Sequence, residues 1–163
     1  MAGTHISISI EDAAARAMLA RLQRPDTTPL MRRIGERIQA STKDRFGEQK
    51  APDGQPWKEL STDYAQTKPR NRHKILTLRG NLRRYIRWQA DATSVQIGTN
   101  TKYAAIHQFG GTIRPKKGKA LAFGGEVVSS VAIPARPYLG ISTQDQQEIH
   151  AIIKEWVLEQ AGE

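Results

Sequence analysis

The chain has 163 residues, no cysteine, and 25 Lys or Arg residues against 16 Asp or Glu residues, which gives a formal charge of +9. The length suits one domain with a modest core, and the missing cysteines exclude disulfides and thiol catalysis. No apolar run approaches the roughly 20 residues that span a bilayer, and no signal peptide is recognisable, so we expect one soluble domain, residues 1–163, without a membrane partner.

The positive charge is concentrated in the middle of the chain. Residues 67–119 hold thirteen Lys or Arg and a single acid, Asp91, whereas residues 120–163 hold two basic and six acidic residues. Such an excess is typical of a surface that meets phosphate groups or an acidic protein, and a solubilising face would have the same composition. The asymmetry favours a charged partner and leaves its identity open.

The first part of the chain predicts a strand followed by helices. Residues 6–10 alternate isoleucine with serine, as in a half-buried strand. Residues 11–23 carry apolar residues four apart, as in an amphipathic helix. Thr28 and Pro29 predict a capped start for a long helix that ends near Phe46.

The middle of the chain predicts two more helices around a basic segment. After a loop at 47–54, we expect Ser61 to cap a short helix over residues 62–67. The polar, basic residues 68–74 are expected to be mobile. The spacing of apolar residues predicts a helix over 77–90.

Strands are predicted in the following part. Residues 94–97 alternate polar and apolar side chains, and residues 111–113 could form another strand. Residues 120–128 contain a Gly-Gly pair between short apolar runs, which is typical of a two-residue hairpin turn.

The last element is predicted to be a helix over residues 142–160. Ser142 and Asp145 have the spacing of a capping box, which satisfies the free N–H groups at a helix start. The acids Asp145, Glu148 and Glu155 are expected to keep the outer face of this helix negative.

Strands at both ends with helices between them predict an α+β fold. It would be one domain in which helices cover an antiparallel sheet, with a projecting β-hairpin arm at 112–131. The expected core contains these apolar residues: Ile6, Ile8, Ile10, Leu30, Ile34, Ile38, Leu82, Ile86, Val95, Ile97, Ile149, Ile153 and Trp156.

One segment combines aromatic and backbone-restricting residues with a polar side chain. Tyr103, Ile106 and Phe109 recur every three residues, so one helical turn could bury all three. Gly110 would end that turn in a left-handed conformation.

A second such segment lies at residues 133–140. Pro134 and Pro137 hold the chain extended around Arg136, whose fork suits a carboxylate or a row of carbonyl oxygens on this chain or a neighbour. Neither segment has the layout of a catalytic site, and both look like parts of a rigid docking surface.

Five motifs occur in order between residues 46 and 141: an opening from Phe46 to Pro52-Asp53-Gly54-Gln55-Pro56-Trp57, Ile75-Leu76 before Gly80-Asn81-Leu82, Ile97-Gly98, Tyr103-Ala104 with His107-Gln108-Phe109-Gly110, and Pro134-Ala135-Arg136-Pro137-Tyr138-Leu139-Gly140. In this order the chain resembles the phage virion morphogenesis family, also called tail completion proteins, of Mu-like and P2-like phages. The first 45 residues and residues 116–131 carry no motif of that family.

The resemblance implies a non-enzymatic structural protein of virion morphogenesis, which completes the tail or forms part of the head–tail neck. It would assemble in the host cytoplasm, self-associate as a ring for which six subunits are suspected, and dock onto neighbouring tail and head-connector proteins. The alternative is a basic module that contacts the genome end by non-specific DNA binding. Stoichiometry, neighbours and the type of tail stay open.

Two groups of residues are predicted to form the working surfaces. The interface group is Tyr103, His107, Gln108, Phe109, Arg136, Tyr138, Leu121 and Phe123. The basic patch is Arg79, Arg83, Arg84, Arg87, Arg114, Lys116, Lys117 and Lys119. Tyr85 and Trp88 lie beside the patch and could stack on bases, but their spacing of three favours at least one of them in the core.

No residues have the spacing of a catalytic, metal or cofactor site. Asp53 fits a turn residue better than a metal ligand, and no phosphate-loop sequence follows the glycine pairs. We therefore expect no catalytic residue, cofactor or hydrolytic activity, and an interface or core role for His107. The four histidines lack the spacing of a zinc site: His5, His73, His107 and His150.

Overall fold

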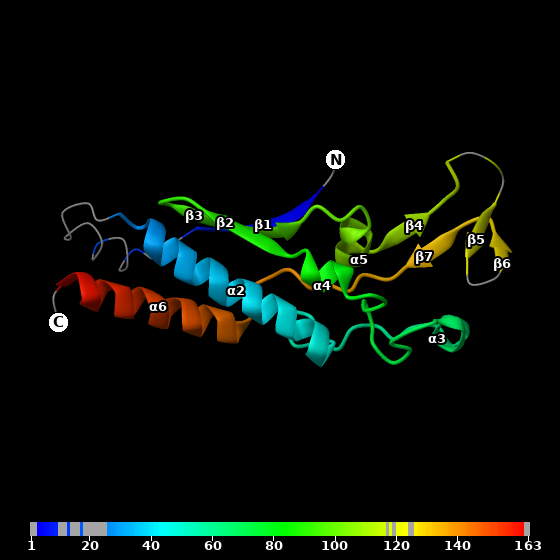
Figure 1. The fold of residues 1–163 in the computed structure, drawn as a ribbon, viewed down its shortest axis with the longest axis horizontal. Helices are drawn as coiled ribbons and strands as arrows, with labels where there is room; N and C mark the ends of the chain where they lie inside the picture. Colours follow the sequence, from blue (N-terminus) through cyan, green and yellow to red (C-terminus); the bar gives the residue numbers. More distant parts are fainter. Residues whose placement is uncertain are drawn as a thin grey trace.

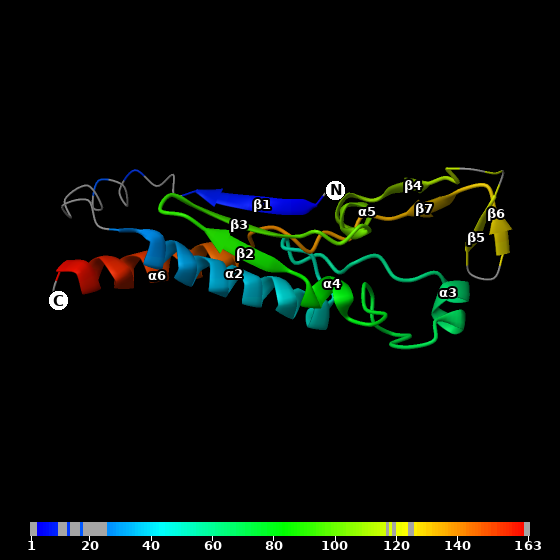
Figure 2. The ribbon, with the colours of Figure 1, turned by 45° about the horizontal axis from the view of Figure 1, so that its top comes forward.

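The computed structural model describes residues 3–9, 13, 17, 26–116, 118, 120–123 and 126–161. They form an elongated molecule of mixed α+β structure, as predicted (Figures 1 and 2). One half contains a sheet and two long helices, and the other contains short helices and two-stranded ribbons. The helix expected over 11–23 and the Gly-Gly turn at 124–125 lie outside the described residues.

A three-stranded antiparallel sheet forms one layer, with the strand order β1 (Thr4–Ser9), β3 (Ser94–Thr99), β2 (Arg87–Ala90). Ile6 and Ile8 of β1 pair with Ile97 and Val95 of β3, so their side chains share one face of the sheet. Helix α2 (Thr28–Glu48) lies against this sheet, and α6 (Thr143–Ala161) lies beside α2 (Figure 1).

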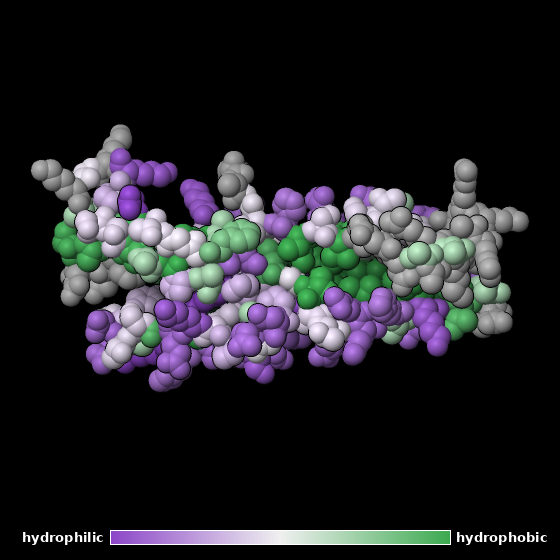
Figure 3. Space-filling view, turned by 180° about the vertical axis from the view of Figure 1, so that it is seen from behind, coloured by the Kyte–Doolittle hydropathy of each residue, from purple (hydrophilic) through white to green (hydrophobic). Residues whose placement is uncertain are grey.

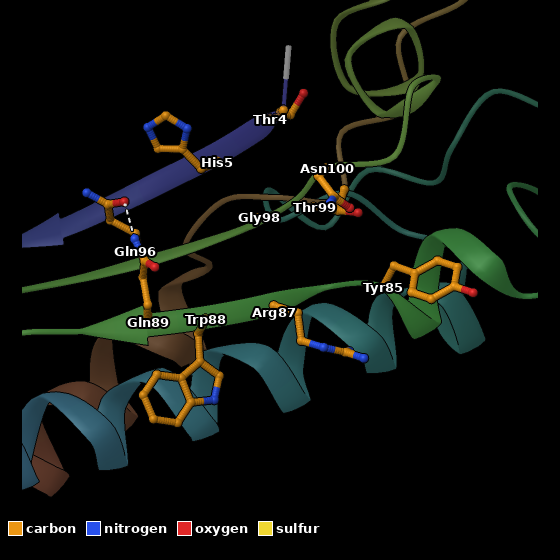
Figure 4. Close-up of a pocket in the computed structure, with 11 residues that line it drawn as sticks. Thr4, His5, Tyr85, Arg87, Trp88, Gln89, Gln96, Gly98, Thr99 and Asn100 are labelled. Atoms are coloured by element: carbon orange, nitrogen blue, oxygen red, sulfur yellow. Dashed lines mark hydrogen bonds between the residues drawn. The ribbon is translucent and has the colours of Figure 1, made fainter. Parts of the chain in front are cut away.

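The opposite face of the sheet is polar. His5, Gln89 and Gln96 lie there, and the Gln89 amide donates a hydrogen bond of 3.1 Å to Gln96 (Figure 4). Trp88 points the other way, toward α2. The strands therefore alternate polar and apolar side chains, as half-buried strands do.

The predicted core is confirmed for every member that the structure describes. Leu30, Ile34 and Ile38 are fully buried at intervals of four residues on α2. They share one cluster with Leu82, Ile86, Val95, Ile97, Ile153 and Trp156, and Ile6, Ile8 and Ile149 pack against it. Ile10 lies outside the described residues.

The single helix predicted over 77–90 is wrong. Gly80 has a φ of 74°, and the helix that follows, α4, covers only Asn81–Arg84. The chain then enters β2, where Ala90 pairs with Val95. The apolar side chains here fit both a helical and a strand period, and pairing with β3 decides in favour of the strand.

The other half of the molecule contains α3 (Thr62–Thr67), α5 (Ala104–Phe109) and four short strands (Figure 2). The strands form two antiparallel pairs, β4 (Gly111–Ile113) with β7 (Val131–Ile133) and β5 (Leu121–Phe123) with β6 (Glu126–Val128). The strand at 111–113 and the pairing within 120–128 were predicted. That this segment acts as an arm stays a prediction.

Helix starts differ in detail from the sequence analysis. The amide of Thr28 donates to the Asp26 carboxylate. The free N–H group at the start of α2 is therefore bound by Asp26, and the predicted capping role of the Thr28 hydroxyl is not seen. The side chain of Ser61 makes no capping hydrogen bond at α3. At α6 the capping box is confirmed, since Ser142 Oγ accepts from the Asp145 amide at 3.1 Å and the Asp145 carboxylate accepts from the Ser142 amide at 2.8 Å.

The surface of the helical layer is hydrophilic, and apolar residues are visible in the centre of the rear face (Figure 3). None of the described helices is both long and apolar enough to cross a bilayer.

A charged residue, Arg45, also lies on the buried face of α2. It is 5 % exposed, and its guanidinium donates to the carbonyl oxygens of Tyr138 at 3.1 Å and Gly140 at 3.0 Å and to the carboxylate of Asp145. The prediction that Asp145 lies on the outer face of α6 is wrong, because this residue is 1 % exposed. Because the Asp145 side chain caps the start of its own helix, it stays close to the backbone, where it contacts Arg45.

Burial raises the pKa of Asp145, but hydrogen bonds from Ser41 and Ser142 and the charge of Arg45 outweigh it, so the pKa lies below its usual 3.8. A carboxyl with a lowered pKa in the folded state stabilises the fold above its ordinary pKa. That contribution is lost as the pH falls through the folded pKa.

We predict that Gly35→Ala destabilises the protein, by about 1–3 kcal/mol. A Cβ at Gly35 would lie 2.7 Å from Cε3 of Trp88, so the helix or the indole must shift. Gly47→Ala in the same helix is the matched control, since its Cβ would meet nothing within 4 Å and a better helix former stabilises. Chemical denaturation measures both, and equal effects would contradict the close approach of α2 to β2.

We predict that Arg45→Met costs about 3–5 kcal/mol, because it leaves the buried carboxylate of Asp145 without its counter-charge. The control is Arg33→Met, which removes the exposed ion pair of Arg33 with Glu159 and should cost less than about 1 kcal/mol. Urea denaturation at neutral pH gives both values. Similar losses for the two variants would show that the Arg45 pair does not hold the fold.

Candidate docking surface

Helix α5 is short and amphipathic, but its buried face is not the one that the sequence analysis chose. Ala104 is fully buried and Gln108 is 9 % exposed, whereas Tyr103 is 43 % and Phe109 is 71 % exposed. The prediction that Tyr103, Ile106 and Phe109 are buried together is therefore wrong. Residues four apart face inward, and the three-residue repeat faces mainly outward.

Gln108 explains which face turns inward. Its amide nitrogen donates to the Leu139 carbonyl at 2.9 Å, and its amide oxygen accepts from the backbone N–H groups of Tyr138 and Leu139, each at 3.0 Å. One side chain therefore satisfies three backbone groups of an extended segment that has no strand partner there. Because such groups must be satisfied when buried, Gln108 orients α5.

Gly110 allows this close approach. Its φ is 73°, and a Cβ there would lie 2.7 Å from the backbone nitrogen of Ala135. The predicted left-handed conformation is wrong, because φ is positive but ψ is −176°, which is extended. The contact with the 134–140 segment was not predicted. The Arg136 amide donates to the His107 carbonyl at 2.8 Å, which joins the same two segments.

Arg136 and Trp57 join the segment at 52–57 to the segment at 134–140. The Arg136 guanidinium donates to the carbonyl oxygens of Lys58 at 2.6 Å and Glu59 at 2.8 Å. The indole N–H of Trp57 donates to the Pro137 carbonyl at 2.7 Å. The row of carbonyl oxygens expected for the arginine fork therefore lies on this chain.

Aromatic rings fill the space behind these hydrogen bonds. Phe46 meets Trp57 edge-on with ring centroids 5.4 Å apart, and Tyr138 lies 5.6 Å from Phe46. Tyr138 is fully buried, and burial raises the pKa of its hydroxyl well above 10. The Asp53 turn is also confirmed, since Asp53 accepts from the Gln55 amide at 3.0 Å.

Residues 52–57, 103–111 and 134–140 thus form one body, here called the motif unit. The side chains of Trp57, Gln108 and Arg136 in this unit bind backbone groups of the same chain. Of the predicted interface group, Gln108, Arg136 and Tyr138 are buried in this unit, and Tyr103 and Phe109 are exposed on it. The docking role of the whole group stays a prediction.

His107 lies half-buried at the edge of the motif unit. Its ring meets that of Tyr103 edge-on at 5.9 Å, and its Nδ1 is buried without a hydrogen-bond partner among the described residues. Burial first, and then the charge of Arg136, lower the pKa of His107, so the neutral ring is favoured.

The predicted basic patch divides into two parts. Arg79, Arg83, Arg84 and Arg87 are exposed around α4 and β2, and none of them pairs with a carboxylate among the described residues. Arg114 and Lys116 are exposed beyond the end of β4, toward the far end of the molecule (Figure 1). Lys117 and Lys119 lie outside the described residues. Tyr85 is 45 % exposed, whereas Trp88 packs against the core, as predicted for one of the two.

Two residues of the interface group lie on the ribbons. Leu121 is half-buried on β5, and Phe123 ends that strand. Their docking role is untested.

The buried position of Lys68 was not predicted from the sequence. Residues 68–74 were expected to be a mobile polar loop, but Lys68 is 2 % exposed and donates from Nζ to the carbonyl oxygens of Asn71 at 2.8 Å and Lys74 at 2.6 Å. The one signal in the sequence is the position of Lys68 directly after a short helix, where its ammonium group can bind carbonyl oxygens of the loop that follows. In the part of the chain that the structure describes, no three His, Asp or Glu side chains come together in a way that could hold a metal ion.

Comparison with known proteins identifies the family. A model described as the phage virion morphogenesis family matches residues 9–158. The chain is 32% identical over 124 residues to the putative capsid assembly protein G of Escherichia phage Mu, covering 72% of this chain and 71% of that protein. It is 30% identical over 135 residues to tail completion protein S of Escherichia phage P2, covering 74% and 77%. No solved structure matches the chain significantly.

A third relative is the Mu-like prophage FluMu G protein 1 of Haemophilus influenzae, 28% identical over 153 residues and covering 91% of this chain and 92% of that protein. The family match includes all three segments of the motif unit. The chain therefore belongs to the phage virion morphogenesis family, and its role is a structural one in the building of the phage particle.

Proposed function

We propose that this protein completes the phage tail or forms part of the head–tail neck, as a non-enzymatic subunit that self-associates into a ring and docks onto adjacent virion proteins. The observation that carries the proposal is the motif unit. The buried side chains of Gln108 and Arg136 bind backbone groups of the same chain, so the unit is a rigid support, and it presents the aromatic side chains of Phe109 and Tyr103 to solvent.

Exposed aromatic residues on a rigid support are the usual anchors of protein interfaces. Large apolar side chains that stay exposed beside each other mark binding surfaces. Ile113 on β4 is 40 % and Leu78 is 38 % exposed, which adds apolar area in the same half of the molecule. The name of the P2 relative supports tail completion, and that of the Mu relative supports a role in assembly.

DNA contact at the genome end is the second candidate. The exposed arginines of α4 and β2 favour it, because they make no ion pair among the described residues and Tyr85 lies exposed beside them. The sequence contains no recognised base-reading motif, so such contact would be with phosphates.

We predict that Phe109→Ala weakens self-association about tenfold or more without changing the thermal unfolding midpoint, because the ring is exposed in the single chain and buried in the assembly. Sedimentation velocity over a concentration series measures association, and calorimetry measures stability. The control is Gln147→Ala, an exposed side chain on α6 that lies outside both α5 and the basic patch. Unchanged association of the Phe109 variant would remove α5 from the interface.

We predict that joint replacement of Arg83, Arg84 and Arg87 by Gln weakens assembly at low salt and flattens its salt dependence, because exposed charges act only over about 8–10 Å in physiological salt. Replacing three exposed basic residues elsewhere, Arg32, Lys50 and Lys154, is the control. If the arginine variant changes only binding to duplex DNA, the result supports DNA contact at the genome end and shows that the patch has no part in protein docking.

A further inference from the structure

One motif of the sequence, Ile97-Gly98, lies outside the motif unit, in the middle strand of the three-stranded sheet. Gly98 pairs with His5 of β1 on one side and with Arg87 of β2 on the other. Directly paired residues share a face, so the two side chains flank the glycine on the polar outer face of the sheet. A Cβ at Gly98 would lie 2.7 Å from the Cα of His5, so this position of the sheet excludes a side chain.

The absent side chain leaves a cavity in this face, here called the sheet hollow (Figure 4). Its volume is about 390 Å³. Among the described residues, every exposed side chain that lines it carries a hydrogen-bond donor, and none is an acid. These side chains are His5, Tyr85, Arg87, Gln89, Gln96 and Asn100. The lining suits a ligand that is rich in acceptor oxygens.

The guanidinium of Arg87 is held in place with part of its donors unused. Its Nη1 donates to the carbonyl oxygens of Arg84 at 2.6 Å and Ile86 at 3.0 Å. Its Nε and Nη2 groups bind nothing among the described residues, and no carboxylate of that part of the chain lies within 4.0 Å. Backbone hydrogen bonds therefore position the fork, and its remaining N–H groups are available to an anion.

The surroundings of the sheet hollow add positive charge. Arg79 and Arg84 are exposed and their side chains make no hydrogen bond or ion pair among the described residues. The single acid of residues 67–119, Asp91, accepts hydrogen bonds from the amide and hydroxyl of Thr93 and from those of Ser94. These bonds lower the pKa of Asp91 to about 2. Its carboxylate is thus bound within its own turn and does not pair with the arginines.

The composition of this face distinguishes between DNA and an acidic protein. The centre of a protein interface is formed by large apolar and aromatic side chains. Tyr85, which is 45 % exposed, is the one exposed side chain of that kind at the sheet hollow in the described part of the chain. Protein–DNA interfaces are polar and strongly positive, and most of their hydrogen bonds go to phosphate and sugar oxygens. The phosphate backbone of DNA therefore fits this face better.

We propose that the sheet hollow binds a phosphate group of duplex DNA, held by the free N–H groups of Arg87 and by the imidazole of His5, while the arginines around α4 contact neighbouring phosphates. β1 and β2 lie two strand spacings apart, roughly 10 Å, which leaves room for one phosphate group between the two side chains. The inference rests on the DNA contact named above as the second candidate, gives it a site, and is independent of the proposed ring.

Fluorescence anisotropy with a short labelled duplex of mixed sequence, over a series of salt concentrations, tests the site. Full-length Arg87→Gln should bind about tenfold more weakly, and the slope of log affinity against log salt should fall by about one, the value for one lost phosphate contact. The matched control is Lys154→Gln, which removes the same charge from an exposed position on α6 and should keep the slope. Equal changes in both variants would show that only net charge matters and would overturn the site.

Competition separates DNA from an acidic protein as the occupant. Polyglutamate at the same concentration of negative charge should displace the labelled duplex from the unmodified protein far less than unlabelled duplex does. Equal displacement would show that the face binds any polyanion, and it would overturn the assignment to DNA.

Cross-linking locates the contact, because the chain has no cysteine of its own. Full-length Gln96→Cys carries a benzophenone maleimide beside the sheet hollow, and irradiation with the duplex should give a covalent protein–DNA adduct. Gln147→Cys, an exposed position on α6, is the control and should give only background.

The outcomes separate the ideas at stake. DNA binding with equal adduct yields from both cysteine variants would overturn the site and leave the second candidate function standing. Absence of DNA binding by the unmodified protein at low salt would overturn both. Sedimentation of the same samples without DNA reports on the ring separately, since the proposed site does not require self-association.

Discussion

The buried guanidinium of Arg45 is the interaction on which the rest of the structure depends. It joins α2 to the carbonyl oxygens of Tyr138 and Gly140 and to the carboxylate of Asp145 at the start of α6. These parts are almost a hundred residues apart in sequence. Any other placement of α2, residues 138–140 and the start of α6 would leave a charge or a carbonyl buried without a partner. The relative positions of these three parts are therefore fixed.

The motif unit follows from that attachment. With the 138–140 segment held against α2, Gln108 can bind the backbone of Tyr138 and Leu139, and Trp57 can bind the Pro137 carbonyl. The position of α5 is then determined, and with it the exposure of Phe109. A docking surface built this way gains rigidity from hydrogen bonds to the backbone, which do not depend on the partner.

Much of the candidate site could be located from the sequence, but the direction of its side chains could not. The motifs at 52–57, 103–111 and 134–140 were singled out, and they do meet in space. Yet Gln108 and Tyr138 turn inward and Phe109 turns outward. The spacing of residues in a six-residue helix is compatible with either face, and the hydrogen bonds of Gln108 to a distant segment make the choice.

The sequence by itself determined the elements whose periodicity is unambiguous: the long helices, the alternating strands β1 and β3, the capping box of α6 and the shared core. A periodic pattern contains this information because it states which side chains can share a face. Only the tertiary structure decided that β2 is a strand and that Arg45, Lys68 and Arg136 are buried. All three bind backbone carbonyl oxygens, which lie in remote segments for Arg45 and Arg136 and in the following loop for Lys68. Every residue carries such a carbonyl, so no pattern of residue types can reveal which of them will meet.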